Sequence, residues 1–560
     1  MKVIIVGGVA GGATAAARIR RLDEHAEITV YERSGYISYA NCGLPYYIGD
    51  VITDPEELTL QTPESFFKRF RINMKIHHEV ISIHPERKTV SVKNLENGEI
   101  FEEKYDKLIL SPGAKPTQPR LPGMGIDKLF TLRTVEDTFR IKEYINKNHP
   151  KSAVLAGGGF IGLELAENLR ELGMDVTIVQ RPKQLMNPFD PDMASMIHNE
   201  MRKHGIKLVL GYTVEGFKEK DNGVEVLLKD NPSLQADMVV LAIGVTPDTV
   251  LAKEAGLELG IKESIVVNDR METSVPDIYA AGDAVQVKHY VTGNDALISL
   301  AGPANKQGRI IADNICGGDS RYLGSQGSSV IKVFDMTAAT TGINETNAKK
   351  SGLEVDTVIL SPMSHAGYYP GGKVMTMKVV FEKETYRLLG AQIIGYEGVD
   401  KRIDVLATAI HAGLKATQLK DLDLAYAPPY SSAKDPVNMA GFMIDNIAKG
   451  TLKQWHLEDM DKISRDKSVV LLDVRTVGEF NRGHMDGFKN IPVDELRERI
   501  SEIEKGKPVY LICQSGLRSY IASRILEGNG YETYNFSGGF RFYDAVVNDR
   551  ALIARAYAVS

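Results

Sequence analysis

Two glycine-rich turns, each set between a short apolar strand and a helix, restrict the possible folds of this chain more than any other feature. The first unit places a strand, a turn, a helix and a second strand at residues 2–6, 7–12, 13–22 and 28–31. The second unit repeats that order at residues 152–155, 157–162, 163–172 and 176–179. A glycine turn between strand and helix directs backbone N–H groups of the helix N-terminus at a pyrophosphate. The pattern therefore predicts two separate dinucleotide sites.

Length and composition indicate a soluble chain of several domains. A chain of 560 residues exceeds what one hydrophobic core supports, so about three or four domains are expected. Hydrophobic residues make up 43% and charged residues 25%, and no apolar run approaches the roughly 18 residues of a membrane span. The small formal charge of -6 favours neither nucleic acid nor membrane as a partner. The start, MKVIIVGG, shows no secretory leader, so a cytoplasmic location is expected.

The first turn, GGVAGG, departs from the usual pattern at one position. Gly7 permits the tight bend and Gly12 allows close helix packing, but Val9 stands where a middle glycine is usual. Glu32, at the end of the second strand, suits a ribose hydroxyl. The other residues expected to border this cofactor are Gly8, Ala10, Gly11 and Arg33.

A second element strengthens this interpretation. The segment TSVPDIYAAGDA, at residues 273–284, combines a strand with Gly282 and Asp283. It resembles the two-part flavin signature of flavoproteins with two dinucleotide sites, in which the aspartate holds the ribityl chain. The resemblance implies FAD in the first unit. Gly113, in the strand end KLILSPGAKP, is expected to border the same cofactor where the chain crosses between the units.

The second turn, GGGFIG, has the complete pattern at Gly157, Gly159 and Gly162, which predicts NADH or NADPH. Its second strand ends in Gln180 and Arg181 instead of a ribose-binding carboxylate. The negative charge that normally excludes a 2'-phosphate is therefore missing, and the choice between NADH and NADPH stays open. The other residues expected at this site are Phe160, Ile161, Glu164 and Gly244.

Cys42 is one of only three cysteines and follows the first unit, a position beside the flavin ring in this architecture. Dithiol reductases carry a C-x4-C pair here, but the residues five positions before and after Cys42 are Ile37 and Tyr47. An internal redox disulfide is therefore excluded. A lone thiol beside flavin can form a mixed disulfide with a substrate, cycle through a sulfenic acid, or fill space.

Four segments carry a more specific resemblance: VGGVAGGATAAARIRRLDE, SYANCGLPYYIG, SHAGYYPGG and AYAPPYSSAKD. Over about residues 1–450 the chain resembles the coenzyme A disulfide reductase family and its NADH-dependent persulfide reductase relatives. The resemblance implies FAD, an NAD(P)H site and a homodimer in which the third domain of one subunit completes the other subunit's active site. It places the two functional tyrosines on Tyr368 and Tyr426, whose hydroxyls can protonate a departing thiolate. Tyr369 and Tyr430 are expected only to pack.

The same resemblance extends to the cofactor pocket. It implies that Phe160 shields the flavin until nicotinamide arrives and that Glu164 lines the nicotinamide pocket. Glu164 fits an ordinary helix position equally well.

Coenzyme A carries phosphates, so cations are expected near Cys42. The candidates are Arg18, Arg21, Arg69 and Arg71, of which the family pattern favours Arg21. Ser38 and Asn41 are expected to hydrogen-bond the substrate beside the thiol.

The C-terminal region contains a second candidate thiol. In VYLICQSGLRSYIASRIL a strand ends at Cys513, and a loop leads through Arg518 into a helix. Successive N–H groups of such a loop stabilise a thiolate or persulfide, with Arg518 adding charge. The region resembles the rhodanese sulfurtransferases, and a cysteine in this loop argues for an active module, whereas a phosphatase of similar topology needs a longer C-x5-R loop. The residues expected to be structural are Asp473, Arg475, His484 and Cys316.

These features predict an α/β chain with two Rossmann-like domains, an α+β dimerisation domain and an α/β rhodanese domain. The expected divisions are residues 1–115 and 245–328 for FAD, 116–244 for NAD(P)H, 329–447 for the dimerisation domain, 448–455 for a linker and 456–560 for the rhodanese domain. The three scattered cysteines predict no metal site.

The expected function is NAD(P)H-driven reduction of coenzyme A disulfide, or of coenzyme A persulfides and polysulfides, through a Cys42 mixed disulfide. Cys513 would handle sulfane sulfur, and the direction of any transfer between Cys513 and Cys42 stays open. Two alternatives remain. One is an NADH oxidase or peroxidase that uses a Cys42 sulfenic acid, and the other is a non-catalytic sulfur carrier or redox sensor.

Overall fold

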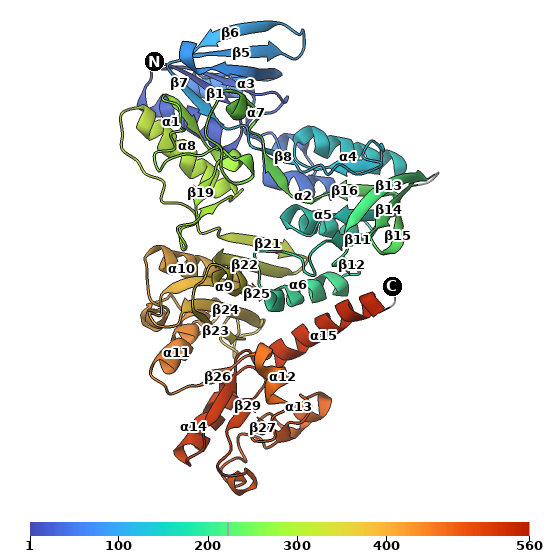
Figure 1. Cartoon of the computed structure of the whole chain (residues 1–560), viewed down its shortest axis with the longest axis vertical. Helices are drawn as coiled ribbons and strands as arrows, with labels where there is room; N and C mark the ends of the chain where they lie inside the picture. Colours follow the sequence, from blue (N-terminus) through green and yellow to red (C-terminus); the bar gives the residue numbers. More distant parts are fainter. Residues whose placement is uncertain (221–222, 559–560) are drawn as a thin grey trace. The chain divides into compact units, whose positions relative to one another are not determined.

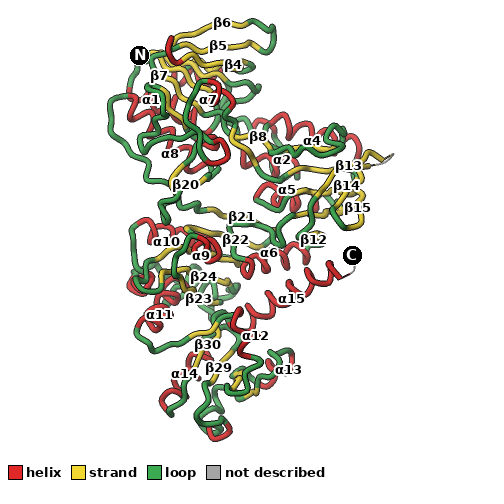
Figure 2. Tube along the Cα trace, viewed as in Figure 1, coloured by secondary structure: helices red, strands yellow, loops and turns green. Residues whose placement is uncertain are grey.

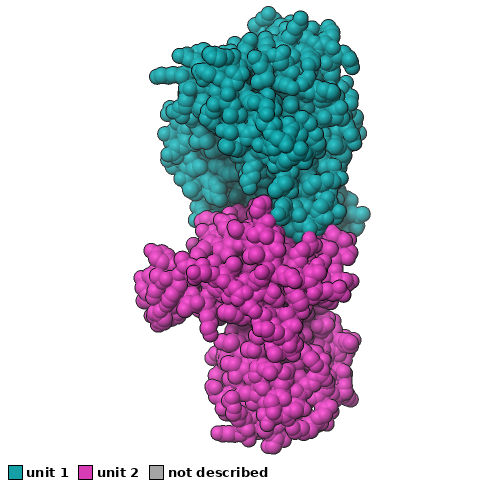
Figure 3. Space-filling view, turned by 90° about the vertical axis from the view of Figure 1, so that its left-hand side faces the viewer, with its two compact units in different colours: residues 1–182, 205–327 teal, residues 183–204, 328–560 magenta. Residues whose placement is uncertain are grey.

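The computed structural model describes residues 1–220 and 223–558 (Figure 1). The chain divides by its internal contacts into two compact units, which Figure 3 colours separately. The first unit comprises residues 1–182 and 205–327, and the second comprises residues 183–204 and 328–560. Within the described residues no helix is long and apolar enough to cross a membrane.

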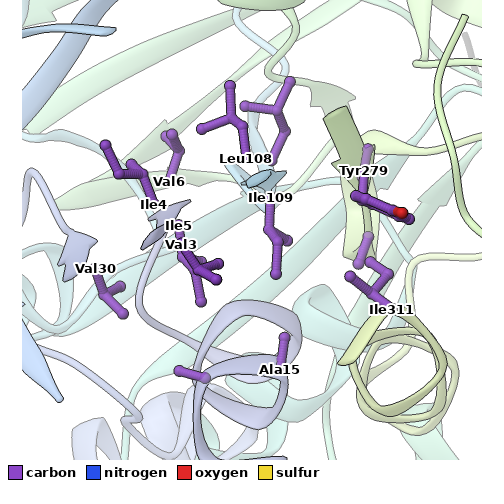
Figure 4. Packing of buried hydrophobic residues seen from close by; sticks show 14 of the residues in the cluster. Val3, Ile4, Ile5, Val6, Ala15, Val30, Leu108, Ile109, Tyr279 and Ile311 are labelled. Carbon is purple, nitrogen blue, oxygen red and sulfur yellow. The ribbon is translucent and has the colours of Figure 1, made fainter. Parts of the chain in front are cut away.

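The first unit contains the parallel sheet that carries the first glycine turn. Its strands, in spatial order, are β18 (Ile278–Ala280), β7 (Lys107–Leu110), β1 (Lys2–Val6), β2 (Glu27–Tyr31) and β3 (Asn73–Lys75). Helices α1 (Ala10–Leu22) and α8 (Ala301–Ile315) pack against each other and against this sheet. Figure 4 shows Val3, Ile5 and Ile109 pointing to the side of the sheet that holds Ala15 and Ile311. Burial on both faces explains why these strands read as continuous apolar runs.

The close contact between α1 and α8 depends on glycine. A Cβ atom at Gly308 would lie 2.4 Å from the carbonyl oxygen of Gly11. Gly308 on α8 is therefore the glycine that lets the two helices approach this closely.

A second parallel sheet in the same unit carries the second glycine turn. Its strands, in spatial order, are β12 (Lys207–Leu210), β11 (Asp175–Gln180), β10 (Ser152–Ala156), β16 (Met238–Leu241) and β9 (Leu129–Thr131). Helices α4 (Val135–Asn148) and α5 (Phe160–Glu171) accompany it. The chain passes between the two parallel sheets through β8 (Ala114–Pro116) and β17 (Val245–Pro247), which pair as an antiparallel ribbon.

Smaller elements complete the first unit, and Figure 2 shows them by type. Two antiparallel sheets consist of β4 (His78–His84), β5 (Thr89–Asn94) and β6 (Ile100–Lys104), and of β13 (Val214–Lys220), β14 (Gly223–Leu228) and β15 (Asn231–Ala236). A two-stranded pair is formed by β19 (Val287–Lys288) and β20 (Asp295–Ala296). The short helices are α2 (Leu44–Ile48), α3 (Pro63–Phe70) and α7 (Val250–Glu254).

The second unit begins with an antiparallel sheet. Its strands, in spatial order, are β21 (Ser329–Val333), β22 (Met336–Gly342), β25 (Leu388–Gly395), β24 (Met375–Glu382) and β23 (Val355–Leu360). The accompanying helices are α9 (Glu345–Lys350), α10 (Val399–His411) and α11 (Pro436–Ala448). The helix α6 (Pro191–Lys203) also belongs to this unit, because the buried ammonium of Lys378 lies 2.7 Å from Asp192 Oδ2 and 3.2 Å from Asp190 Oδ2.

The C-terminal part of the second unit is a third parallel sheet. Its strands, in spatial order, are β26 (Gln454–Trp455), β30 (Thr533–Phe536), β29 (Val509–Ile512), β27 (Val470–Asp473) and β28 (Lys489–Asn490). Its helices are α12 (Met460–Ile463), α13 (Val477–Arg482), α14 (Leu517–Gly528) and α15 (Gly539–Ala558). On α15, the buried carboxylate of Asp549 accepts a hydrogen bond from His198 Nδ1 of α6 at 2.8 Å.

Candidate active sites

The first glycine turn has the geometry of a dinucleotide site. Gly7 has φ +97°, and a Cβ there would lie 2.1 Å from the carbonyl oxygen of Ser111. A Cβ at Gly12 would lie 1.9 Å from Gly7 O, so both positions require glycine. The helix α1 begins at Ala10 with no side-chain cap among the described residues and no acidic residue in its first turn. Its N-terminal amides therefore suit a pyrophosphate.

Glu32 lies at the end of β2, where a ribose-binding carboxylate is expected. Its carboxylate accepts hydrogen bonds from the N–H groups of Gly8 at 2.8 Å and Ser34 at 2.9 Å. Burial raises the pKa of Glu32, against the opposing effect of these two hydrogen bonds. The neighbouring side chain of Arg33 is half exposed and pairs with Asp248 at 2.8 Å.

The second part of the flavin signature contains an ion pair that sequence inspection missed. Gly282 has φ +82°, and its N–H donates to Gln307 Oε1 at 2.8 Å. The carboxylate of Asp283 accepts a hydrogen bond from Arg133 Nη2 at 2.7 Å. Arg133 follows β9 and also approaches Gly113, whose hypothetical Cβ would lie 3.5 Å from the same nitrogen. No local motif marks Arg133 in the sequence.

The second glycine turn repeats this design with one difference. Gly157 has φ +120° and faces the carbonyl of Ala242, and a Cβ at Gly162 would lie 2.2 Å from Gly157 O. At Gly159, by contrast, a Cβ would meet no atom of the described chain within 4 Å, which leaves room for a ligand at the start of α5. Gly244, with φ +106°, also has open space beside it in the described chain.

Gln180 takes the position at the second site that Glu32 takes at the first. Its Oε1 accepts a hydrogen bond from the Gly158 N–H at 3.0 Å, as the Glu32 carboxylate does from Gly8. The amide preserves the hydrogen bond but carries no negative charge. Phe160 and Ile161 begin α5, which has no first-turn acidic residue and, within the described chain, no side-chain cap. Both turns therefore fit a dinucleotide.

Cys42 lies in the single turn Asn41–Gly43, directly before α2, and its thiol is free and exposed. The Ser38 N–H donates to the Gly8 carbonyl at 2.8 Å, which ties the Cys42 segment to the first glycine turn. Ser38 has φ +44°, an unfavourable conformation for a residue with a Cβ. Such a backbone conformation is typical of functional loops.

The helix of the second site supplies the electrostatic surroundings of Cys42. Although the Cys42 side chain is exposed, partial burial of its thiol raises the thiol pKa. The carboxylate of Glu164 raises this pKa further, and Arg133 opposes both effects. Glu164 lies on α5 and is hydrogen-bonded to the hydroxyl of Tyr46. Burial and the nearby Glu167 raise the pKa of Glu164 to about 7. A carboxyl group with a pKa near neutrality thus acts electrostatically on the thiol, and neither Tyr46 nor Glu167 carries a sequence signal.

Replacing Glu164 by glutamine should make Cys42 more reactive above neutral pH. Above about pH 7 the Glu164 carboxylate is ionised and disfavours the thiolate, so its removal lowers the pKa of Cys42. We expect alkylation of Cys42 by iodoacetamide to become roughly threefold to tenfold faster at pH 8, with a smaller ratio at pH 6, where Glu164 is mostly protonated in the parent protein.

The alkylation rate is measured on the Cys42 peptide by mass spectrometry across this pH range. Glu171→Gln, on the exposed end of the same helix, is the matched control. If the Glu164→Gln protein and the parent protein are alkylated at equal rates across this pH range, the electrostatic coupling of Glu164 to Cys42 is contradicted.

The four arginines that the sequence predicts to bind substrate differ in their surroundings. Arg18 is partly buried, and its Nε donates to Asp313 on α8 at 2.7 Å. Arg21, Arg69 and Arg71 are exposed, and the guanidinium of Arg71 lies over the Phe67 ring. Asn41 is half-buried in the same turn as Cys42. The exposed arginines are accessible to a phosphate, whereas the charge of Arg18 is already balanced by Asp313.

In the second unit, Tyr368 and Tyr426 meet although they are far apart in sequence. Their hydroxyl oxygens are 2.5 Å apart, and the side chains are 76% and 45% exposed. The hydrogen bond between the two hydroxyls raises the pKa of Tyr426. Tyr369 contacts the His365 ring, but Tyr430 is 72% exposed, so the prediction that Tyr430 packs is wrong.

Cys513 is fully buried at the end of β29, in a loop that directs hydrogen-bond donors at its sulfur. Sγ accepts from the Gly516 N–H at 3.1 Å and from the Ser519 hydroxyl at 3.2 Å. Gly516 has φ +99°, and Asn535 Nδ2 donates to its carbonyl at 3.2 Å, which orients the peptide. This loop suits a thiolate or persulfide.

Arg518 is paired with a carboxylate that sequence inspection missed. Its Nη1 and Nη2 donate to the two carboxylate oxygens of Glu479, both at 2.7 Å. The hydrogen bonds from Arg518 lower the pKa of Glu479 to about 2, so the pair is ionised at neutral pH. The capping box that starts at Thr476 was the available signal for Glu479. Arg518 therefore adds little net charge to the Cys513 loop.

Of the residues expected to be structural, Asp473 and Arg475 are buried, His484 is exposed, and Cys316 lies in the first unit. Arg475 pairs with Asp473 at 2.7 Å, and its guanidinium lies over the Phe540 ring. His484 stacks on Phe480 at the surface. Cys316 is partly buried against the core of the first unit.

Two dinucleotide turns beside one free thiol, together with a second thiol in an anion-stabilising loop, define a class of protein: a flavin- and nicotinamide-dependent disulfide oxidoreductase with an appended sulfurtransferase-like domain. The chain belongs to the pyridine nucleotide-disulphide oxidoreductase family, whose model matches residues 1–308. The family's dimerisation domain matches residues 328–436, and a rhodanese-like domain matches residues 456–545. The predicted fold class is confirmed, and the family uses FAD and NAD(H).

Similar proteins share most of this architecture. The coenzyme A disulfide reductase of Staphylococcus aureus (strain JH9) is 38% identical over 442 residues, which is 79% of this chain and 99% of that protein. The crystal structure of reduced Bacillus anthracis CoADR-RHD is 48% identical, with a TM-score of 0.96 over 98% of both chains. An NAD-dependent persulfide reductase from A. fulgidus is 38% identical, with a TM-score of 0.91 over 97% of this chain and 100% of that one.

Proposed function

We propose that the chain reduces coenzyme A disulfide, coenzyme A persulfides or polysulfides with NAD(P)H, through a mixed disulfide on Cys42. The observation that carries this proposal is the free, exposed thiol of Cys42, tied to the first nucleotide turn and bordered by the helix of the second. Because no second cysteine lies within five residues of Cys42, the substrate supplies the other sulfur. The similar proteins named above support this substrate class.

The chemistry needs two electrons for each S–S bond, which FAD and a nicotinamide cofactor supply when bound. The Cys42 thiolate attacks one sulfur of the substrate, and the other sulfur leaves as a thiolate and takes up a proton. Two-electron reduction of the Cys42 mixed disulfide then returns the Cys42 thiolate and releases the second thiol. Coenzyme A disulfide yields two coenzyme A thiols, and a persulfide yields a thiol and sulfide.

The chain's other residues have roles that follow from their chemistry. The Tyr368 and Tyr426 hydroxyls protonate the leaving thiolate, in a homodimer in which each subunit's tyrosines serve the other subunit's Cys42. Arg21, Arg69 and Arg71 bind the phosphates of coenzyme A, and Ser38 and Asn41 hold the substrate near the thiol. Cys513 carries sulfane sulfur as a persulfide.

A comparison of electron acceptors tests this function. The rates of NADH and NADPH oxidation are measured anaerobically with coenzyme A disulfide, coenzyme A persulfide, polysulfide and hydrogen peroxide, and in separate aerobic assays with oxygen. We expect at least one sulfur substrate to exceed peroxide by about 10²-fold or more in kcat/KM. Faster Cys42-dependent turnover of peroxide would favour the oxidase or peroxidase. Slow turnover of every substrate would favour a carrier or sensor.

Gln180→Glu tests the assignment of the second site and its cofactor preference. The new carboxylate would repel the 2'-phosphate of NADPH and keep the hydrogen bond from the Gly158 N–H. We expect kcat/KM for NADPH to fall at least about tenfold relative to that for NADH. Gln235→Glu, on an exposed strand position, adds the same charge elsewhere and serves as the control. If the ratio of kcat/KM for NADPH to kcat/KM for NADH is unchanged, the cofactor ribose does not lie beside Gln180.

A further inference from the structure

The tyrosine pair lies on two loops without regular secondary structure. We call residues 361–374, between β23 and β24, the first tyrosine loop, and residues 422–435, before α11, the second. Tyr368 and Tyr426 project from these loops and are largely exposed, so little packing holds their side chains. The short contact between their hydroxyls therefore requires that the two loop backbones be held in register.

A buried arginine on α10 connects the two loops. Arg402 is only 1% exposed, and its Nη2 lies 2.9 Å from the Ser364 carbonyl in the first tyrosine loop. The same nitrogen lies 3.3 Å from the Tyr430 carbonyl and 3.0 Å from Ser431 Oγ in the second. One guanidinium group thus bonds the backbones that carry both tyrosines. The other two nitrogens also donate, Nη1 to the Gly398 carbonyl at 3.1 Å and Nε to Asp435 Oδ2 at 3.2 Å. A lysine ammonium does not reproduce this planar set of donors.

Asp435 balances the buried charge and extends the connection. Its Oδ2 accepts hydrogen bonds from Arg402 Nη2 at 3.0 Å and from the Ser431 hydroxyl at 2.6 Å. Its Oδ1 accepts the Val437 N–H at 3.0 Å, which caps the start of α11. Asp435 therefore anchors the second tyrosine loop to a helix at the same time as it neutralises Arg402.

Two further contacts support the same arrangement. The Ala366 N–H donates to the Ser431 carbonyl at 2.9 Å, so the two loops also touch directly. Gly398 has φ +67°, and a Cβ there would lie 2.1 Å from Arg402 Nη1, so the glycine leaves space for the guanidinium group.

We propose that Arg402 and Asp435 are positioning residues for the reaction, which hold Tyr368 and Tyr426 together so that the hydroxyl pair can donate a proton to the leaving thiolate. The proposal rests on the function proposed above. In this arrangement the buried Arg402–Asp435 ion pair, which touches neither thiol nor substrate, aligns the exposed pair of catalytic tyrosines.

A double-mutant cycle tests this inference in the full-length flavoprotein. Arg402→Lys keeps the charge but loses the fork of donors, and we expect kcat/KM for coenzyme A disulfide to fall about tenfold while KM for NADH stays unchanged. In the Tyr368→Phe/Tyr426→Phe background the same change should cost less than about twofold, because the groups that it positions are gone. Asp192→Asn, at the buried Lys378 cluster of the same unit, is the control and should leave kcat/KM unchanged.

Ser431→Ala gives a second, uncharged perturbation if Arg402→Lys folds poorly. It removes one hydroxyl between Arg402 and Asp435, and we expect a loss of about threefold in kcat/KM, again absent in the double-phenylalanine background. The inference is overturned if Arg402→Lys and Ser431→Ala retain the parent rate, or if their effects persist fully without the tyrosines. If the double-phenylalanine protein itself retains the parent rate, the tyrosines are not the proton donors, and the positioning role of Arg402 and Asp435 is overturned as well.

Discussion

Replacing Cys42 by serine is expected to lower kcat/KM for every disulfide and persulfide substrate by at least about 10³-fold. A serine hydroxyl cannot form the mixed disulfide, and no other cysteine lies within five residues of position 42 to take its place. The cofactor turns should be unaffected, since the Cys42 side chain is exposed and serine differs from cysteine by one atom. The measurement is anaerobic NADH oxidation with each sulfur substrate, alongside the flavin content of the purified protein.

Cys316→Ser is the matched control, because Cys316 is partly buried against the core and lies on α8's C-terminal end. It should retain the parent rate. Full activity of the Cys42→Ser protein with any sulfur substrate would remove the central element of the proposed mechanism.

Replacing Cys513 by serine should abolish sulfur transfer by the C-terminal domain, with a loss of at least about 10³-fold, and leave the reduction of coenzyme A disulfide within about twofold of the parent rate. Persulfide formation needs the Cys513 sulfur, whereas reduction of a simple disulfide needs only Cys42. Sulfur transfer is measured as thiocyanate formed from a persulfide donor and cyanide.

Ser519→Ala provides a graded comparison, because its hydroxyl is one of the two donors to Cys513 Sγ. Loss of that donor should slow sulfur transfer by about tenfold. Sulfur transfer that persists in the Cys513→Ser protein would show that the loop is not the site of the chemistry.

Local motifs identified the parts of each site that lie close together in sequence. The glycine turns at residues 7–12 and 157–162 depend on backbone angles and close approaches that only glycine permits, so their spacing predicted strand, turn and helix correctly. The CQSGLR loop around Cys513 follows the same logic. The assigned roles of these residues in binding and catalysis stay predictions.

Contacts between distant segments carried no such signal. Arg133 bonds Asp283, and Glu164 bonds Tyr46 and acts electrostatically on Cys42, because separate strands and helices of the first unit converge there. Arg518 was expected to act as a free charge, yet Glu479 on a neighbouring helix neutralises it. The helix α6 joins the second unit through Lys378 and Asp549, although its sequence lies between two strands of a sheet in the first.

The sequence by itself determined that this chain has two nucleotide turns, a thiol with no second cysteine nearby in the sequence, and a sulfurtransferase-like loop. Each of these features depends on a short run of residues with specific backbone requirements. Only the tertiary structure decided which charges are balanced and which side chains meet. Tyr368 and Tyr426 illustrate the difference: their hydroxyl contact is set by Arg402 and Asp435, which bond two loops from different parts of the chain. Hydrogen bonds of this kind depend on how elements pack in space, and short-range sequence patterns do not encode that packing.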